Sequence, residues 1–185
     1  MRQFCCALLC ILLVVGCIKE GIYYPNLTTI SEEEVPDSVG LLTADMGEEV
    51  RELVLSFHIS KRDDPNQDID CVTILFGIAS LLEGYGLAPI AIYIGDDSSG
   101  KGHALYVYRI NSKFGSFGGG LFDNNEATFT SVEKLVRYVA TKDKFYADSF
   151  DIFDIRVNYP EYDLGGELQT YSGPFENRLV PPVEP

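Results

Sequence analysis

The sequence predicts an α+β fold in which a buried helix packs on an antiparallel β-sheet. Polar side chains are few in residues 71–83, and a helix of this composition has to be covered on most sides. Two strand-like runs follow, at 103–110 and 117–123, with glycine-containing turns before and between them. Helix-periodic segments precede and follow this region. This order favours one domain in which helices cover an antiparallel meander.

The chain begins with a predicted signal peptide, residues 1–16. Arg2 is its positive residue, and the unbroken apolar run 4–15 is too short to span a membrane but typical of a signal-peptide core. The run ends in Val14-Val15-Gly16-Cys17, which looks like a prokaryotic lipobox. We therefore expect Cys17 to carry lipid and to anchor the exported protein on the extracytoplasmic side of the cell membrane. The alternative is an ordinary secretory signal in which Cys17 is incidental.

The net charge and the cysteine content limit the kinds of partner and of chemistry that we expect. The formal net charge is −14, which repels nucleic acid, so we expect no nucleic-acid partner. After loss of the leader and lipidation of Cys17, Cys71 is the one remaining thiol and has no intramolecular disulfide partner. It is therefore either a buried apolar residue or a reactive group.

The rest of the chain divides into three predicted parts: a lipidated arm or linker at 17–45, a single domain at 46–160, and a proline-containing tail at 161–185. The domain begins with an amphipathic helix at 47–61, whose buried face includes Val50 and Val54. His58 lies at the edge of that face, and we expect a packing or surface role for it.

The start of the central helix is well marked. Asp70 stands at the N-cap position, where its carboxylate can accept backbone N–H groups of the first turn. Cys71 is then the first helical residue, at the positive end of the helix dipole, which favours a thiolate over a thiol. This position favours a reactive role for Cys71 over a purely structural one.

Four strands and one further helix complete the predicted domain. The strands are expected at 87–94, 103–110, 117–123 and 150–157, and Thr130-Ser131-Val132-Glu133 has the pattern of a capping box before a helix that continues to 139. A turn is expected at 111–116. Antiparallel pairing of 103–110 with 117–123 would bring the end of the second strand beside the start of the first.

This pairing predicts a catalytic site. Cysteine catalysis needs a nucleophile, a base that shares its proton, and a group that orients the base. Cys71 is the candidate nucleophile, His103 the base, and Asp123 or its neighbour Asn124 the orienting group. The Cys71 backbone N–H is the expected oxyanion donor, and a second donor is sought among Gln67 and Asn66, which lie just before the nucleophile. We expect neither a metal site nor a cofactor, because one cysteine and two scattered histidines lack ligand spacing.

At these residues the chain resembles the transglutaminase-like superfamily of cysteine enzymes, which share this order of parts with papain-like enzymes. The resemblance covers about 68–125 and depends on Asp70-Cys71, on Gly84-Tyr85-Gly86-Leu87-Ala88, on Gly102-His103-Ala104 and on Leu121-Phe122-Asp123. It implies a transglutaminase-like fold, with Cys71 as nucleophile, His103 as base and Asp123 as the orienting acid.

The resemblance implies a membrane-anchored cysteine protease, amidase or acyltransferase, which acts on amide bonds of an extracytoplasmic peptide or protein through a thioester. Two alternatives stay open. One is a cell-wall cysteine endopeptidase, whose motif also begins Asp-Cys, although Val72-Thr73 follows here in place of Ser-Gly. The other is a non-catalytic surface lipoprotein that uses the same fold to bind a peptide or protein partner.

Overall fold

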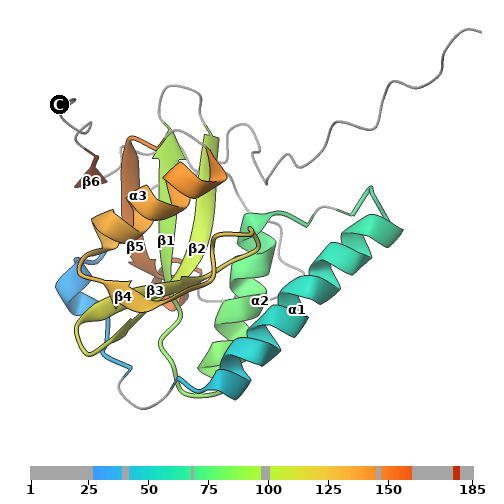
Figure 1. The fold of residues 1–185 in the computed structure, drawn as a ribbon, viewed down its shortest axis with the longest axis horizontal. Helices are drawn as coiled ribbons and strands as arrows, with labels where there is room; N and C mark the ends of the chain where they lie inside the picture. The colour runs from blue at the N-terminus through green and yellow to red at the C-terminus, as the bar shows by residue number, and fades with distance from the viewer. Residues whose placement is uncertain are drawn as a thin grey trace, which may run out of the picture.

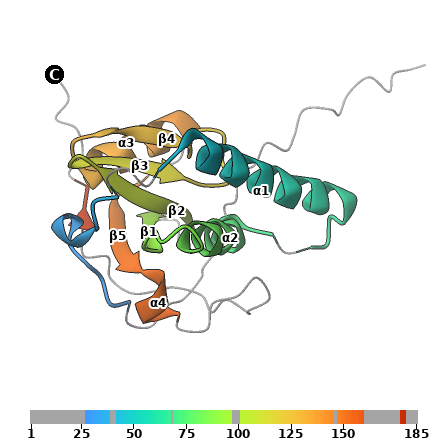
Figure 2. The same ribbon diagram turned by 90° about the horizontal axis from the view of Figure 1, so that it is seen from below.

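The computed structural model of the chain describes residues 27–38, 42–67, 69–96, 101–144, 147–159 and 177–179. Its architecture is α+β, which confirms the predicted class: an antiparallel sheet carries helices on both faces (Figures 1 and 2). The predicted leader (1–16) and the lipidation candidate Cys17 lie outside the described residues. Among the described residues, none of the helices combines the length and the hydrophobicity that crossing a bilayer requires.

The sheet has the strand order β4-β3-β2-β1-β5-β6, and each neighbouring pair is antiparallel. In chain order the strands are β1 (Ile90–Asp96), β2 (Lys101–Ile110), β3 (Lys113–Phe117), β4 (Asn125–Phe129), β5 (Ser149–Asp154) and the two-residue β6 (Asn177–Arg178). The central strand β1 is buried along nearly its whole length because helices lie on both sides of it.

One face of the sheet is covered by α1 (Ala44–Asp63) and α2 (Cys71–Glu83). The predicted helix 71–83 is confirmed, and Ile74, Ile78 and Leu82 repeat at four-residue spacing within the core on this face. Helix α1 begins three residues before its predicted start, because Thr43 caps it by accepting the Met46 N–H. The Tyr85 hydroxyl, just beyond the end of α2, donates to a carboxylate oxygen of Glu49 near the start of α1 and so joins the two helices.

The opposite face is covered by α3 (Val132–Asp143). Its Leu135, Val136 and Val139 are fully buried in a second core. This core also contains Leu105 and Val107, the alternate residues of β2 whose side chains lie on this face of the sheet. The predicted capping box at 130–133 is wrong in register. The N-cap is Ser131, whose hydroxyl accepts the Lys134 N–H.

The hairpin between β2 and β3 differs from the predicted one. The predicted turn 111–116 and strand 117–123 are wrong, since the chain reverses at Asn111 and Ser112 alone and β3 occupies 113–117. Both turn residues adopt a positive φ (49° and 59°), as a two-residue hairpin turn requires. The Asp37 carboxylate accepts their backbone N–H groups, at 3.1 and 3.4 Å. Residues 118–124 consequently form the loop between β3 and β4.

Other strands also differ from the predicted ones in their bounds. Strand β1 begins at Ile90 rather than at 87, and β4 was not predicted. The strand expected at 150–157 ends at Asp154, whose side chain accepts the Arg156 N–H and so caps the short helix α4 (Ile155–Asn158).

The described part of the predicted arm packs on the domain. The Ile30 N–H donates to the Ile152 carbonyl at 2.8 Å, the Ser38 N–H donates to the Arg109 carbonyl at 2.7 Å, and Val35 is buried in the α3-side core. A 3₁₀ turn, η1 (Glu32–Glu34), lies between them. We therefore count 27–38 and the start of α1 with the domain rather than with a linker ending at 45. From the predicted tail, 177–179 are described, and they extend the sheet edge through β6.

Candidate active site

Cys71 is the first residue of α2, as the sequence predicts. The Asp70 carboxylate caps the helix by accepting the N–H groups of Val72 (3.1 Å) and Thr73 (2.9 Å), together with the Thr73 hydroxyl (3.1 Å). The Cys71 N–H lies outside these cap bonds, at the positive end of the helix. Cys71 is 6% exposed, so its thiol lies at the margin of the core rather than on an open surface.

His103 lies in a part of β2 that pairs with β1 on one side but has no strand on the other. His103 pairs with Ile94 of β1, but the ladder between β2 and β3 extends only from Tyr106↔Phe117 to Ile110↔Lys113. Beyond Phe117 the chain leaves the sheet as the 118–124 loop. His103 therefore faces this loop rather than a neighbouring strand, which leaves room for polar side chains beside it.

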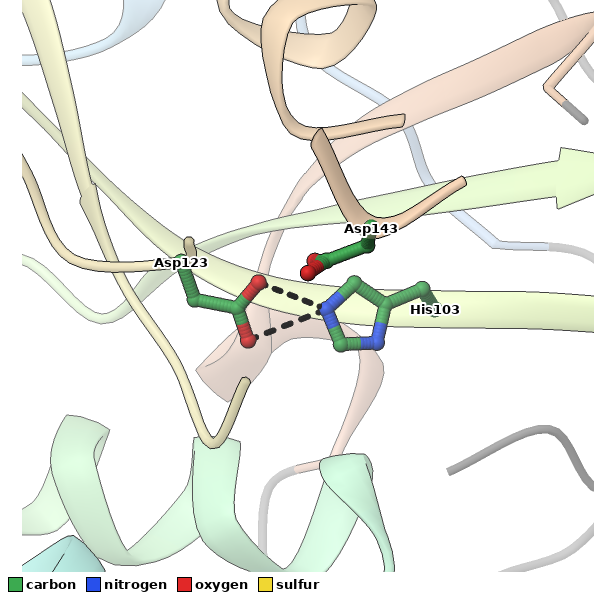
Figure 3. A group of neighbouring side chains, drawn as sticks. All are labelled: His103, Asp123 and Asp143. Carbon is green, nitrogen blue, oxygen red and sulfur yellow. Dashed lines mark hydrogen bonds and ion pairs between the residues drawn. The ribbon is translucent and has the colours of Figure 1, made fainter. Parts of the chain in front are cut away.

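The loop brings Asp123 against His103 (Figure 3). The Nε2 atom of His103 lies 2.9 and 3.0 Å from the two carboxylate oxygens of Asp123, whose side chain is fully buried. The Gly120 N–H also donates to Asp123, at 2.5 Å, and the Ser116 hydroxyl donates to its carbonyl at 2.6 Å. A buried carboxylate with this many donors is held in one orientation.

The glycines of the loop are required by this close packing. A Cβ atom on Gly118 or Gly120 would lie 2.6 or 2.8 Å from an Asp123 carboxylate oxygen, closer than real Cβ atoms approach. The glycine-rich segment 118–120 therefore wraps the carboxylate at a distance that other residues do not permit.

The Cys71 side chain lies near enough to the His103 imidazole to influence its charge. Burial opposes a charge on this imidazole, but the Asp123 carboxylate, its hydrogen bond and the nearby Cys71 together raise the pKa of His103 well above its usual value. Since Nε2 faces Asp123, the other ring nitrogen points away from that carboxylate (Figure 3). The residues predicted as base and orienting acid are thus joined by a hydrogen bond, and the predicted nucleophile lies near them.

The alternative candidates lie elsewhere. Asn124 is exposed, and its amide group hydrogen-bonds the backbone of Gly118, accepting at 3.4 Å and donating at 3.5 Å. Gln67 is exposed in the loop before α2, where its carbonyl accepts the Lys61 ammonium group at 2.6 Å. Asp123, rather than Asn124, is therefore the group beside His103.

His58 has a more specific contact than the surface role expected for it. Its Nε2 lies 2.9 Å from the carbonyl oxygen of Gly119, in the loop that carries Asp123. A Cβ atom on Gly119 would lie 2.6 Å from the Ile74 side chain, so the loop is confined between α1 and α2. His58 was noted in the sequence as a residue at the edge of an apolar helix face, but its partner could not be found without the fold.

Tyr93 is a residue that the sequence did not mark. It is buried on β1, and its hydroxyl occupies the space beside Gly102 where a Cβ would come within 1.9 Å. Burial raises the pKa of Tyr93, and the proximity of Cys71 and Asp70 raises it further, so the neutral hydroxyl persists beside the start of α2.

Asp143, the last residue of α3, is a second missed residue, and it points toward His103 and Asp123 (Figure 3). One nitrogen of His103 and one oxygen of each aspartate lie within 4.8 Å of one another. A nitrogen and two carboxylate oxygens are a donor set that zinc or iron accepts. A metal ion on these atoms would have to replace the hydrogen bond between His103 and Asp123, so the arrangement present suits proton sharing better.

Comparisons with known proteins do not identify this chain. No family model matches it, and no significant match is found among curated proteins. The resemblance to transglutaminase-like enzymes therefore stays a prediction, and any function has to be argued from the geometry of the site.

Proposed function

We propose that the protein is a cysteine-dependent hydrolase or acyltransferase that acts on amide bonds of a peptide or protein. The observation that carries this proposal is the hydrogen bond between the His103 imidazole and the buried Asp123 carboxylate, with Cys71 at the start of α2 near enough to affect the pKa of His103. These are the nucleophile, base and orienting group that thiol catalysis needs. The fold we propose for it is the transglutaminase-like one.

In the proposed reaction His103 takes the Cys71 proton, and the thiolate attacks the carbonyl carbon of the amide. The resulting oxyanion lies at the start of α2, where the Cys71 N–H can donate to it. When the carbon–nitrogen bond breaks, the imidazolium returns the proton to the leaving amine and a thioester remains on Cys71. Water then gives hydrolysis, or a second amine gives transfer, with His103 again accepting the proton.

Asp123 has a supporting role in this reaction. Its carboxylate holds the His103 ring in one orientation through Nε2 and stabilises the imidazolium that forms when the thiol ionises. Because Asp123 is buried and also receives the Gly120 N–H, it stays in place while the charge on the ring changes.

The proposed setting follows from the start of the chain. We propose that Cys17 carries lipid and holds the protein at the extracytoplasmic side of a prokaryotic cell membrane. The substrate would then be an exported or extracellular peptide or protein. The acidic composition, at a formal charge of −14, supports a partner other than nucleic acid.

A non-catalytic binding protein is the second candidate. The observation in its favour is the burial of Cys71, which is only 6% exposed and belongs to the apolar core cluster of α1 and α2. On this alternative, Cys71 is a packing residue and the His103–Asp123 pair a buried structural bond.

Alkylation of Cys71 distinguishes the two candidates. Because the chain holds five cysteines, the modified peptide that contains Cys71 has to be quantified by mass spectrometry after iodoacetamide treatment at pH 7. We expect His103→Ala to slow this reaction about tenfold or more, since one pKa unit of lost thiolate stabilisation is a factor of ten. His58→Ala is the matched histidine variant, for which we expect a change of only a few-fold. Equal rates in His103→Ala and wild type would overturn the enzymatic proposal in favour of the binding protein.

A further inference from the structure

Strands β3 and β4 pair irregularly just after the loop that carries Asp123. Phe114 of β3 lies opposite Phe129 of β4. Two residues further along β3 the register has shifted, and Ser116 lies opposite Asn125, the first residue of β4. Irregularities of this kind are common beside active sites, where they re-aim a side chain. The contacts of the Asn125 side chain are therefore informative.

The side chains of Asn125 and Ser116 hold the backbone of Asp123 on both sides. The amide group of Asn125 donates to the Phe122 carbonyl at 2.8 Å and to the Ser116 hydroxyl oxygen at 3.0 Å. The Ser116 hydroxyl, which is fully buried, donates in turn to the Asp123 carbonyl at 2.6 Å. These bonds use both amide hydrogens and the hydroxyl hydrogen. Because both peptide groups that flank the Asp123 Cα are bonded, the direction of its side chain is fixed.

Asn125 is itself held from β2. The Tyr108 hydroxyl donates to the Asn125 backbone carbonyl at 2.7 Å. Gly115 permits this bond, because a Cβ atom there would lie 2.5 Å from the Tyr108 hydroxyl oxygen and 2.6 Å from the Asn125 carbonyl oxygen. Tyr108 and Ser116 are both buried, so water competes little for these groups. A central strand of the sheet thus supports the series of bonds that ends at Asp123.

These bonds have a consequence for the His103 ring. A neutral imidazole carries its hydrogen on one nitrogen and accepts at the other. A carboxylate only accepts, so Asp123 selects the form with the hydrogen on Nε2, which lies 2.9 and 3.0 Å from its oxygens. The other ring nitrogen, which points away from Asp123, is then the one that accepts a proton (Figure 3). If the carboxylate turned away, both forms of the ring would be populated.

We propose that Asn125 is a positioning residue, which acts through Ser116 to fix the backbone of Asp123 and so keeps the His103 hydrogen on Nε2. Its side chain bonds neither the predicted nucleophile nor the predicted base, and its effect on them passes through the loop. This inference rests on the proposed function for its catalytic meaning, because a hydrogen on Nε2 leaves the other nitrogen as the acceptor of the Cys71 proton.

The test is nitrogen NMR of the His103 imidazole in the intact protein, at a pH above its titration, with Asn125→Ala and Ser116→Ala. In wild type we expect one neutral form, with the hydrogen on Nε2. In Asn125→Ala we expect both forms, and exchange of the Nε2 hydrogen with water about tenfold faster, the factor that the loss of one ordinary hydrogen bond gives. Ser116→Ala should act in the same direction.

Asn124→Ala is the matched control. Asn124 is the exposed neighbour of Asn125, and its amide group bonds the Gly118 backbone at 3.4 and 3.5 Å. We expect this variant to keep the single form of the His103 ring and the wild-type exchange rate.

The position of the ring hydrogen separates positioning from packing. A residue that only stabilises the fold would lower the free energy of unfolding and leave the hydrogen on Nε2. That result in both Asn125→Ala and Ser116→Ala would overturn the proposal. Ser116→Ala removes a single hydroxyl group, so it decides the question if Asn125→Ala does not fold.

The proposed function fails separately. If alkylation of Cys71 ignores His103→Ala while Asn125→Ala mixes the two forms of the ring, Asn125 positions Asp123 but the pair does not serve a thiol enzyme. If alkylation depends on His103 while the ring keeps one form in both variants, the enzymatic proposal stands and the role of Asn125 is wrong.

Discussion

Helices α2 and α3 cover opposite faces of the sheet and bring opposite helix ends to the same imidazole. Helix α2 begins at Cys71 with its positive end, where a thiolate is favoured. Helix α3 ends at Asp143 with its negative end, where a carboxylate is disfavoured. His103 lies between them and is hydrogen-bonded to Asp123, and Cys71 helps to raise its pKa.

The difference teaches how one fold can favour charge at one position and suppress it at another. The α2 end supports ionisation of the group that would react, whereas the α3 end places a carboxyl where its ionisation is disfavoured. On this account, changes at the Asp123 carboxylate should affect thiol reactivity most, changes at the glycines that surround it next, and changes at the outer contacts least.

The largest effect is expected from Asp123. Asp123→Ala removes the acceptor of the His103 Nε2–H and of the Gly120 N–H, both away from bulk solvent. We expect the free energy of unfolding to fall by about 1–3 kcal/mol from these unsatisfied donors, and Cys71 alkylation at pH 7 to slow about tenfold or more. Denaturant titration and the mass-spectrometric assay measure the two effects. Asn124→Ala, at the exposed neighbour, should change neither.

The next largest effect is expected from the glycine-rich segment 118–120. Gly118→Ala forces a Cβ to 2.6 Å from an Asp123 carboxylate oxygen, and we expect a loss of about 1–3 kcal/mol in stability with slower alkylation. Gly47→Ala is the control within α1, because nothing lies within 4 Å of its Cβ and helical alanine should stabilise by about 0.5–1 kcal/mol. Equal stability in the two variants would mean that the loop does not hold Asp123 tightly.

Stability should depend on pH through His103. Its pKa is raised above the usual value of 6.5, so the folded state binds the proton more tightly than the unfolded chain. This contribution is full below about pH 6.5 and is lost as the pH rises through the raised pKa. Unfolding free energies of wild type and His103→Gln, measured from pH 5 upward, should therefore differ most at low pH. A difference that grows with rising pH would contradict this sign.

The smallest effect is expected at His58. His58→Ala removes the 2.9 Å bond to the Gly119 carbonyl, an exposed contact worth about 0.5–1.5 kcal/mol. Alkylation of Cys71 should slow only a few-fold, because Ile74 still confines the loop. His58→Gln, which can donate to the same carbonyl, should restore the wild-type rate, whereas a purely electrostatic role would leave it slow.

The start of α2 was predicted well from residues that are close together in the chain. Asp70 accepts the N–H groups of the first turn and α2 extends from Cys71 to Glu83, because capping and burial are both decided within a few residues. The proximity of His103 and Asp123 was also anticipated, but from a hairpin with the wrong strand. The turn at Asn111 and Ser112 lacks the glycine that usually marks a positive φ, so the register could not be read from the chain.

The α3 end could not be predicted in the same way. Asp143 reaches His103 only because α3 lies over the face of the sheet that carries Leu105 and Val107, and Asp143 is 40 residues away in the chain. The predicted helix ended at 139, so Asp143 was not recognised as part of it, and its position beside His103 depends on the completed fold. The contacts of His58 and Tyr93 were missed for the same reason, since they are with a loop and with a strand neighbour.

The most direct measurement of the central claim is the pKa of the His103 imidazole, followed by NMR in wild type and in Cys71→Ser. Because the nearby Cys71 helps to raise this pKa, the account predicts a clearly lower value in Cys71→Ser, with Asp123 still in place. An identical titration in the two proteins would show that the thiol and the imidazole are not coupled, and would contradict the account.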